Sequence, residues 1–220
     1  MATAAPQRGT QLAGPQMAGA QMGGSQMAGP QLALPSGERQ PDASVTVYGV
    51  IVLGIAAVVV LGALMGAWLA LRSGTKVWPP QGVRVENYFG TTLSITMLLS
   101  LAGGWWALYG TSRDERGQAS VALLLTIFMD LAFINLLTYV MRGAHFGPST
   151  STYGVMYYAV NVAVVVVAAS GILVAGVALA RVLGGQVTAR QPALAWSAAW
   201  YGTGVVVAWF VVYTMTYVVK

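Results

Sequence analysis

Five long apolar blocks, separated by short polar breaks, make up most of the chain after residue 44. A helix needs about 20 residues to cross the hydrocarbon core of a bilayer, where it satisfies its own backbone hydrogen bonds. Each block is long enough for such a crossing. The blocks cover residues 45–71, 87–109, 120–141, 153–183 and 194–219. The sequence therefore predicts an all-α, polytopic membrane helix bundle with five transmembrane helices.

The composition agrees with a membrane location and excludes several kinds of chemistry. Of the 220 residues, 56% are hydrophobic and 8% are charged, which leaves too little polar surface for a soluble domain of this size. The absence of cysteine and the single histidine, His145, exclude thiolate catalysis, zinc and iron–sulfur clusters, and bis-histidine haem ligation within the chain. The basic residues are scattered singly, so we expect no nucleic acid as a partner. We find no Walker loop or histidine-activated serine, and expect no catalytic residue.

Residues 1–44 form a separate part of the chain, a tail rich in Gln, Gly, Met and Pro. A pentapeptide recurs five times between residues 11 and 35, as QLAGP, QMAGA, QMGGS, QMAGP and QLALP. These units contain no aromatic or β-branched residue to build a core, so we expect a disordered or extended tail. Alternatively, the evenly spaced Met and Leu side chains lie along the surface of a partner. The predicted division is a tail over 1–44 and a membrane domain over 45–220.

Three polar side chains inside the predicted spans are candidates for intramembrane chemistry: Asp130, Asn135 and Asn161. A charged carboxylate at the depth of Asp130 costs several kcal/mol unless it is protonated, paired or turned toward a polar interior. Asn135 and Asn161 could hydrogen-bond it if their helices pack together. Asp130 either acts in a proton relay or subunit contact, or ties two helices as a neutral acid. We favour the tie, because no second intramembrane acid, basic residue or histidine continues a relay.

Aromatic residues near the ends of the blocks fit the boundary between hydrocarbon and headgroups, where an amphipathic ring is stabilised. They are Tyr48, Trp68, Trp78, Tyr109, Tyr153, Tyr213 and Tyr217. We expect these side chains to act as ordinary interfacial anchors.

Between the first two blocks, Trp78-Pro79-Pro80-Gln-Gly82-Val resembles the W-P-P-x-G-[IV] signature of subunit III of haem-copper oxidases such as cytochrome c oxidase. Further matches follow in order, over roughly residues 48 to 217. They include Tyr153-Gly154, similar to the entry to a family helix, and Trp200, Tyr201, Trp209 and Tyr213, similar to the family's closing helix. The chain is thereby identified as a divergent, five-helix member, without the first two helices of the seven-helix form.

The chain departs from the family where the family has buried polar residues. Apolar residues stand at positions of its glutamates, glutamine and histidines: Ala57, Leu137, Val140, Val164 and Val167. Turns, glycines and aromatic residues remain. The scaffold of the family is therefore kept, whereas the polar network associated with lipid headgroups and proton uptake is lost.

The resemblance implies a non-catalytic accessory subunit of a respiratory terminal oxidase, supporting the assembly, lipid binding and stability of an oxygen-reducing, proton-pumping complex. It implies no redox cofactor in this chain. Haem and copper are expected in the partner subunits, the catalytic subunit I together with subunit II, and phospholipid is a further expected ligand. Two alternatives stay open: an accessory subunit of a nitric oxide reductase, and a stand-alone small membrane transporter or lipid-binding protein.

The resemblance also implies a location and an orientation. The expected protein is a multi-pass component of the prokaryotic plasma membrane, with its N-terminus in the cytoplasm and its C-terminus outside. Four arginines then lie at helix ends on the cytoplasmic side, where each could meet an anionic headgroup. They are Arg113, Arg116, Arg181 and Arg190.

Overall fold

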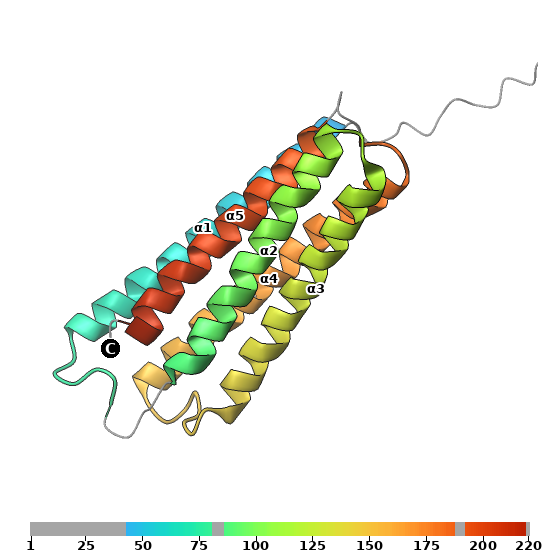
Figure 1. The fold of residues 1–220 in the computed structure, drawn as a ribbon. Helices are drawn as coiled ribbons and strands as arrows, with labels where there is room; N and C mark the ends of the chain where they lie inside the picture. The colour runs from blue at the N-terminus through green and yellow to red at the C-terminus, as the bar shows by residue number, and fades with distance from the viewer. Residues whose placement is uncertain (1–42, 81–85, 188–191, 219–220) are drawn as a thin grey trace, which may run out of the picture. The chain divides into compact units, whose positions relative to one another are not determined.

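The computed structural model describes residues 43–80, 86–187 and 192–218, and five long α-helices cover the predicted spans (Figure 1). The helices are α1 (Ala43–Ser73), α2 (Asn87–Ser112), α3 (Arg116–Gly143), α4 (Thr152–Leu183) and α5 (Ala193–Tyr213), and a π-helical segment, η1 (Thr214–Val218), follows α5. All five are long and apolar enough to cross a membrane. The predicted all-α, five-helix membrane fold is therefore confirmed. The predicted tail, apart from its last two residues, lies outside the described part of the chain.

Helix α4 is the longest element, and its start is defined by a capping residue. The Ser151 hydroxyl oxygen accepts a hydrogen bond from the Gly154 backbone N–H at 3.1 Å, which satisfies a donor that has no partner within the helix. The 32 residues of α4 correspond to about 48 Å of helix, compared with about 30 Å of hydrocarbon. A single helix of this length has to tilt or protrude from the hydrocarbon.

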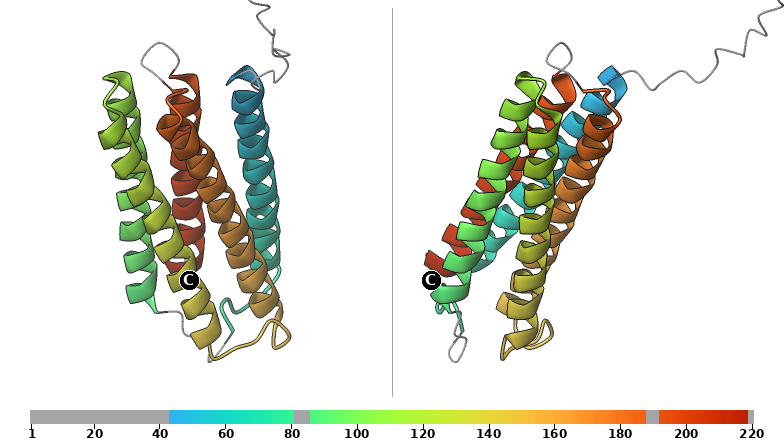
Figure 2. Two further views of the ribbon diagram at one scale, coloured as in Figure 1. Left: turned by 90° about the vertical axis from the view of Figure 1, so that its right-hand side faces the viewer. Right: turned by 45° about the vertical axis from the view of Figure 1, so that its right-hand side comes forward.

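Helices α2 to α5 pack against their neighbours in the chain, but α1 packs away from α2. Helix α1 packs against α4 and α5, whereas α2 packs against α3 and α5. Figure 2 (left) shows the resulting arrangement, in which α4 and α5 stand between α1 on one side and α2 with α3 on the other. Because successive helices alternate in direction, the starts of α1, α3 and α5 share one end of the bundle with the ends of α2 and α4. We call this end the arginine end, and the opposite one the Trp78 end.

The two ends of the bundle have different cores. Near the Trp78 end, the buried side chains are large, and several aromatic ones are no more than 1% exposed: Trp68, Phe133, Tyr157, Trp209 and Tyr217. Near the arginine end, small residues dominate, including Ala107, Ala119, Ala122, Ala178, Ala195 and Ala199. Small side chains let helix backbones approach closely. The helices are therefore held by aromatic packing at one end and by close contact at the other.

The expectation that the terminal aromatic residues are interfacial anchors is wrong for three of them. Trp68, Tyr153 and Tyr217 are only 1–2% exposed and lie inside the aromatic core. Tyr48 and Tyr109, at 67% and 47% exposed, do lie on the outer surface near helix ends, where the anchoring role predicts them. Position near a helix end does not determine whether an aromatic ring faces the lipid or the neighbouring helices.

Candidate functional site

Asp130 is the only buried Asp, Glu, Lys, Arg or His among the described residues. Its Oδ1 atom accepts a hydrogen bond of 2.6 Å from the hydroxyl of Ser100, so the contact joins α3 to α2. Its Oδ2 atom faces Gly171 of α4, where an added Cβ would lie 3.8 Å away. A cavity of about 30 Å³ adjoins the carboxyl group and is large enough for a single water molecule.

The two asparagines do not pair with Asp130, contrary to the sequence-based expectation. The Asn161 side-chain N–H donates to the backbone oxygen of Tyr157, within its own helix. On α4, Gly171 lies at the level of Asp130. Asn161 is ten residues from Gly171, so it lies about 15 Å from that level along the helix axis. Asn135 is five residues beyond Asp130, about 140° around α3, and its side chain is exposed. Packing of α3 against α4 therefore leaves all three groups apart.

The surroundings of Asp130 support a structural contact. Asp130 has one hydrogen bond to a neutral hydroxyl, and the other buried polar side chains of the described part are Ser94, Ser100, Thr111, Asn161 and Thr216. An acid in such a place can tie two helices, and an interhelical hydrogen bond of this type contributes about 0.5–2 kcal/mol. We interpret Asp130 as a tie between α2 and α3.

We expect Asp130→Asn to leave the stability of the protein within about 1 kcal/mol of the original, because the amide oxygen can accept the same hydrogen bond from Ser100. Asp130→Ala should be less stable than Asp130→Asn, since it removes the acceptor and enlarges the cavity. Thermal unfolding in detergent and turnover of the assembled complex provide the test. Loss of turnover in Asp130→Asn, with assembly intact, would support the relay instead.

The Trp78-Pro79-Pro80 segment at the end of α1 belongs to the aromatic core. The Trp78 ring packs edge-on against Trp68 at 5.3 Å and against Tyr153 at 5.1 Å between centroids. The peptide bond between Trp78 and Pro79 is cis. Gly82, the last glycine of the motif, lies outside the described residues. The motif thus brings the loop after α1 against the first turn of α4.

Gly154 occupies a place where a side chain does not fit. A Cβ atom at this position would come within 2.5 Å of the backbone oxygen of Gly147, in the loop before α4. The adjacent Tyr153 is 2% exposed and contacts Trp68, Trp78 and Phe146. The Tyr-Gly pair therefore combines a buried ring with a close backbone approach at the entry to α4.

Three of the aromatic motif residues of α5 contact different neighbouring elements. Trp209 is fully buried and its indole N–H donates to the Ser94 hydroxyl of α2 at 3.0 Å. The hydroxyls of Tyr201 and Ser170 are hydrogen-bonded at 2.5 Å, which joins α5 to α4. Tyr213 stacks on Tyr217 with centroids 5.5 Å apart.

Trp200 differs from these residues because half of its surface is exposed. Its ring lies 5.8 Å from that of Trp105 on α2 and 5.4 Å from that of Trp196, one turn earlier on α5. The four motif residues of α5 thus include three that hold the interior together and one on the outer surface.

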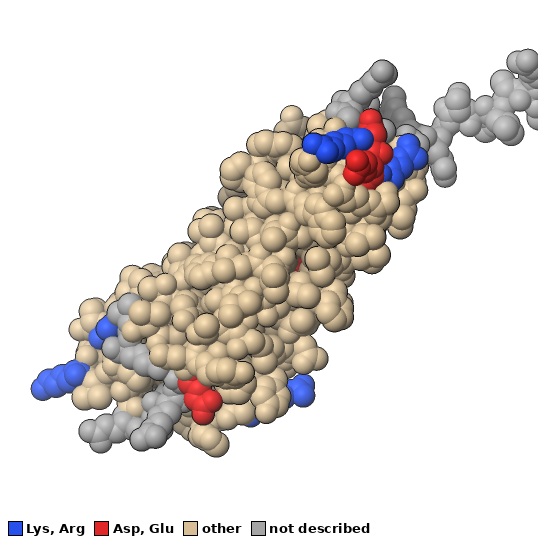
Figure 3. Space-filling model, viewed as in Figure 1, with Lys and Arg blue, Asp and Glu red and all other residues tan. Residues whose placement is uncertain are grey.

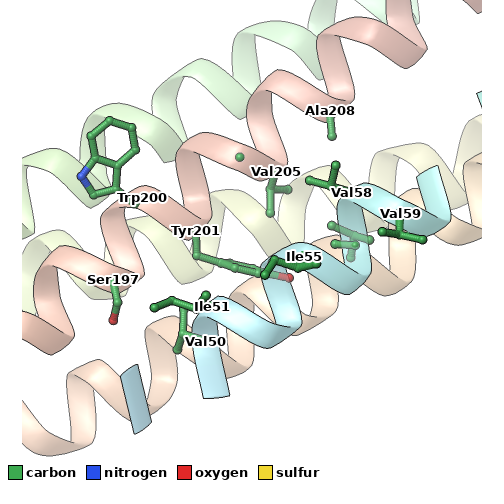
Figure 4. A pocket seen from close by; sticks show the side chains of 14 residues that line it. Val50, Ile51, Ile55, Val58, Val59, Ser197, Trp200, Tyr201, Val205 and Ala208 are labelled. Carbon is green, nitrogen blue, oxygen red and sulfur yellow. The ribbon is translucent and has the colours of Figure 1, made fainter. Parts of the chain in front are cut away.

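An apolar groove of about 420 Å³ lies between α1 and α5 (Figure 4). Ile51, Ile55 and Val58 line it from α1, and Tyr201 and Val205 line it from α5. Sequence reasoning missed this groove. The available signal was the small residues Gly54, Ala57, Gly204 and Ala208, which lack the volume to fill the space between the two helices. Its apolar lining suits a hydrocarbon chain.

Three of the four arginines proposed to meet headgroups, Arg113, Arg116 and Arg181, lie at the arginine end of the bundle. Arg113 places its guanidinium 4.3 Å from the centre of the Tyr109 ring, and Arg116 approaches Gly185. Arg181 donates a 2.8 Å hydrogen bond to the Thr46 hydroxyl, so it also joins α4 to α1. Arg190 lies outside the described residues. On the face shown in Figure 3, the charged side chains gather at the two ends of the bundle.

Within residues 43–80, 86–187 and 192–218, no three His, Cys, Asp or Glu side chains come together in a way that could hold a metal ion. The described part of the chain is a multi-pass helical membrane protein in which two buried polar contacts, Ser100 with Asp130 and Ser94 with Trp209, connect neighbouring helices. Residues 46–220 match the family model for cytochrome c oxidase subunit III, so the chain belongs to that family. The resemblance inferred from the Trp-Pro-Pro motif and the aromatic residues of α5 is thereby confirmed.

A curated relative is the cytochrome c oxidase subunit 3 of Chondrus crispus, which is 29% identical over 143 residues. That similarity covers 64% of this chain and 53% of the relative. The chain therefore spans about half the length of the curated relative it matches.

Proposed function

We propose that this chain is a non-catalytic accessory subunit of a respiratory haem-copper terminal oxidase. The observation that carries the proposal is the family match over residues 46–220. The contacts of the motif residues agree with it, since Trp78, Tyr153 and Trp209 all serve the packing of the bundle. The proposed role is to support the assembly and stability of an oxygen-reducing, proton-pumping complex.

The proposed partners are the catalytic subunit I and subunit II of the same oxidase. Haem and copper belong to those partners in this proposal, and the present chain contributes no ligand to them. Electron transfer and oxygen reduction therefore take place outside this chain. Its contribution to turnover is indirect, through the stability of the membrane-embedded assembly.

Phospholipid is the proposed ligand of the chain itself. The groove between α1 and α5 has an apolar lining that suits an acyl chain. Its α1 wall begins near Val50, about two turns from the helix start, so an acyl chain there could extend toward a headgroup at the arginine end. Arg181, which contacts Thr46 near the start of α1, and Arg113 and Arg116, at the α2–α3 turn of the same end, carry positive charges for anionic headgroups.

Replacing Arg113 and Arg116 together by Gln should lower the content of anionic lipid in the purified protein by up to about thirtyfold, because each charge near the surface contributes about 1 kcal/mol to such binding. The matched control is Arg72→Gln with Lys76→Gln, two charges removed from the Trp78 end. Lipid extraction and mass spectrometry measure the ratio of anionic to zwitterionic lipid. An equal loss in both double variants would show that the effect is not specific to the arginine end.

The proposed location is the prokaryotic plasma membrane, with the arginine end in the cytoplasm and the Trp78 end outside. The arrangement into a tail over 1–44 and a membrane domain over 45–220 is part of the same proposal. Labelling of a cysteine introduced at residue 76 by a membrane-impermeant reagent in intact cells tests the orientation. The proposal expects labelling there, and protection of a cysteine introduced at residue 114.

Gentle extraction from native membranes, followed by purification through a tag on this chain, tests the proposed function. Haem absorption in the visible spectrum, together with a large histidine-rich membrane subunit in the mass spectrum, is the expected result. Nitric oxide reductase as the host would be recognised from its own catalytic subunit. A colourless preparation containing this chain alone would overturn the proposal in favour of a stand-alone transporter or lipid-binding protein.

A further inference from the structure

Four residues of α3 form a polar stripe on the outer surface of the bundle near the Trp78 end. Asn135, Thr138, Tyr139 and Arg142 follow one another at spacings of three, one and three residues, which places them on one face of the helix. We call this stripe the α3 polar face. Together with Leu131 and Ile134 it lines a shallow open groove.

With α3 centred in the bilayer, Asn135 lies too deep in the membrane to reach water. The centre of the 28-residue helix α3 falls between residues 129 and 130, so Asn135 is about 8 Å from the middle along the axis. The hydrocarbon core extends about 15 Å from its middle, so the amide lies about 7 Å inside the boundary. The side chain of asparagine is too short to span that distance.

The amide of Asn135 has no partner of its own within the described part of the chain. No side-chain hydrogen bond of Asn135 to any residue in 43–80, 86–187 or 192–218 is formed, and its side chain is exposed. The neighbouring Thr138 differs, because its hydroxyl donates to the Ile134 backbone oxygen at 2.7 Å. A carboxamide carries two donors and an acceptor, and leaving them unpaired in hydrocarbon is unfavourable.

The position of Asn135 is unusual on this surface. Among the described residues of the five helices, it is the only exposed carboxamide or charged side chain more than two turns from a helix end. Exposed positions at similar depth elsewhere are apolar, such as Leu98 and Val166. Acyl chains of the lipid can pack against these apolar side chains, but an acyl chain offers no hydrogen bond to Asn135.

We propose that the α3 polar face packs against a membrane-spanning helix of another subunit. That helix carries a hydrogen-bonding side chain at the depth of Asn135 and a carboxylate at the depth of Arg142. The inference rests on the proposed function for the identity of the assembly, and it adds the face through which this chain joins it. Tyr139, 63% exposed, supplies an aromatic surface between the two polar contacts.

A second copy of this chain fits the α3 polar face less well than a different subunit does. Two copies with the same orientation in the membrane are related by a two-fold axis, which brings residues of equal depth together. Asn135 could then pair with Asn135, but Arg142 would face Arg142, and like charges near the hydrocarbon boundary repel each other. A different subunit with an acidic residue avoids this repulsion.

Photo-crosslinking in the native membrane, with the full chain, tests the inference. A benzoylphenylalanine replaces Leu131, beside the α3 polar face and 52% exposed, or Leu173, on α4 and 71% exposed as the matched control. The expected result is an adduct between residue 131 and a different membrane subunit, with no such adduct from residue 173. An adduct between two copies through residue 131, or a protein adduct from residue 173 alone, would overturn the inference.

A substitution series supplies a second readout. Asn135→Leu should lower the recovery of partner subunits roughly three- to tenfold, because one interhelical hydrogen bond is lost, and Asn135→Gln should retain more of it. Leu173→Ala is the control and should have no effect. Full recovery of the partner subunits with Asn135→Leu would contradict the inference. The proposed function would still stand in that case, because the haem-bearing complex would still be recovered. A colourless preparation from the unmodified chain would instead contradict both the proposed function and this inference.

Discussion

Replacing Trp209 by Ala should destabilise the bundle by about 3 kcal/mol, since removal of a fully buried tryptophan leaves a cavity that the surrounding helices fill only in part. Trp209 packs on Phe133 at 4.9 Å between centroids and donates its indole N–H to Ser94. Ser94 keeps its own hydrogen bond to the Gly90 backbone oxygen, so most of the loss comes from packing. Unfolding by denaturing detergent, followed by circular dichroism, measures the free energy of unfolding.

Trp200 provides the matched control for Trp209. It lies on the same helix, nine residues earlier, but half of its surface is exposed. Trp200→Ala should change the free energy of unfolding by less than about 1 kcal/mol, because the ring fills no enclosed space. Similar destabilisation by the two substitutions would contradict the assignment of Trp209 to the interior and Trp200 to the outer surface.

Gly154→Ala should reduce the stability of the protein by about 2–3 kcal/mol and lower the yield of folded material in the membrane. The added Cβ would come within 2.5 Å of the Gly147 backbone oxygen, and the loop before α4 must move to accommodate it. This shift would also disturb Tyr153 and its contacts with Trp68 and Trp78. The midpoint of thermal unfolding in detergent measures the effect.

Gly176 is the control on the same helix. A Cβ added there meets nothing within 4 Å, and alanine is favoured over glycine in a helix by up to about 1 kcal/mol. Gly176→Ala should therefore be neutral or slightly stabilising. If Gly154→Ala were tolerated as well as Gly176→Ala, the close approach between the loop and α4 would not exist in the native protein.

The sequence allowed prediction of the five helices because each needs only a local property, a long apolar run. The predicted and observed starts of α2 coincide at Asn87, and both α4 ends agree within one residue. Among the helix starts, the largest difference is at Arg116, four residues before the predicted start of α3, because polar residues continue that helix. Backbone hydrogen bonds continue there beyond the apolar run.

The contacts between helices were not predictable in the same way. The partner of Asp130 is Ser100, thirty residues earlier on α2, and nothing local to either residue indicates the pairing. Which face of α3 meets α2 depends on the packing of several helices together. The motif resemblance located Trp78, Tyr153 and Trp209, but the burial of Tyr153 and Trp209, and the packing of Trp78 against Tyr153, became evident only from the arrangement of α1, α4 and α5.

The exposure of Asn135 was also not predictable from the sequence. A sequence places an asparagine within a span, and the usual expectation is that it turns inward to pair with a buried acid. In the structure, the inward face of α3 at this level is occupied by Phe133 and Leu137, both fully buried. Asn135 is thereby turned outward, and its partner has to come from outside the described chain.

Purification through the haem-bearing subunit of the native oxidase, with quantification of every subunit by mass spectrometry, tests the central proposal most directly. The proposal predicts one copy of this chain for each haem-copper centre, retained when the detergent preserves bound lipid. Complete absence of the chain from an active, intact oxidase prepared in this way would contradict its role as an accessory subunit.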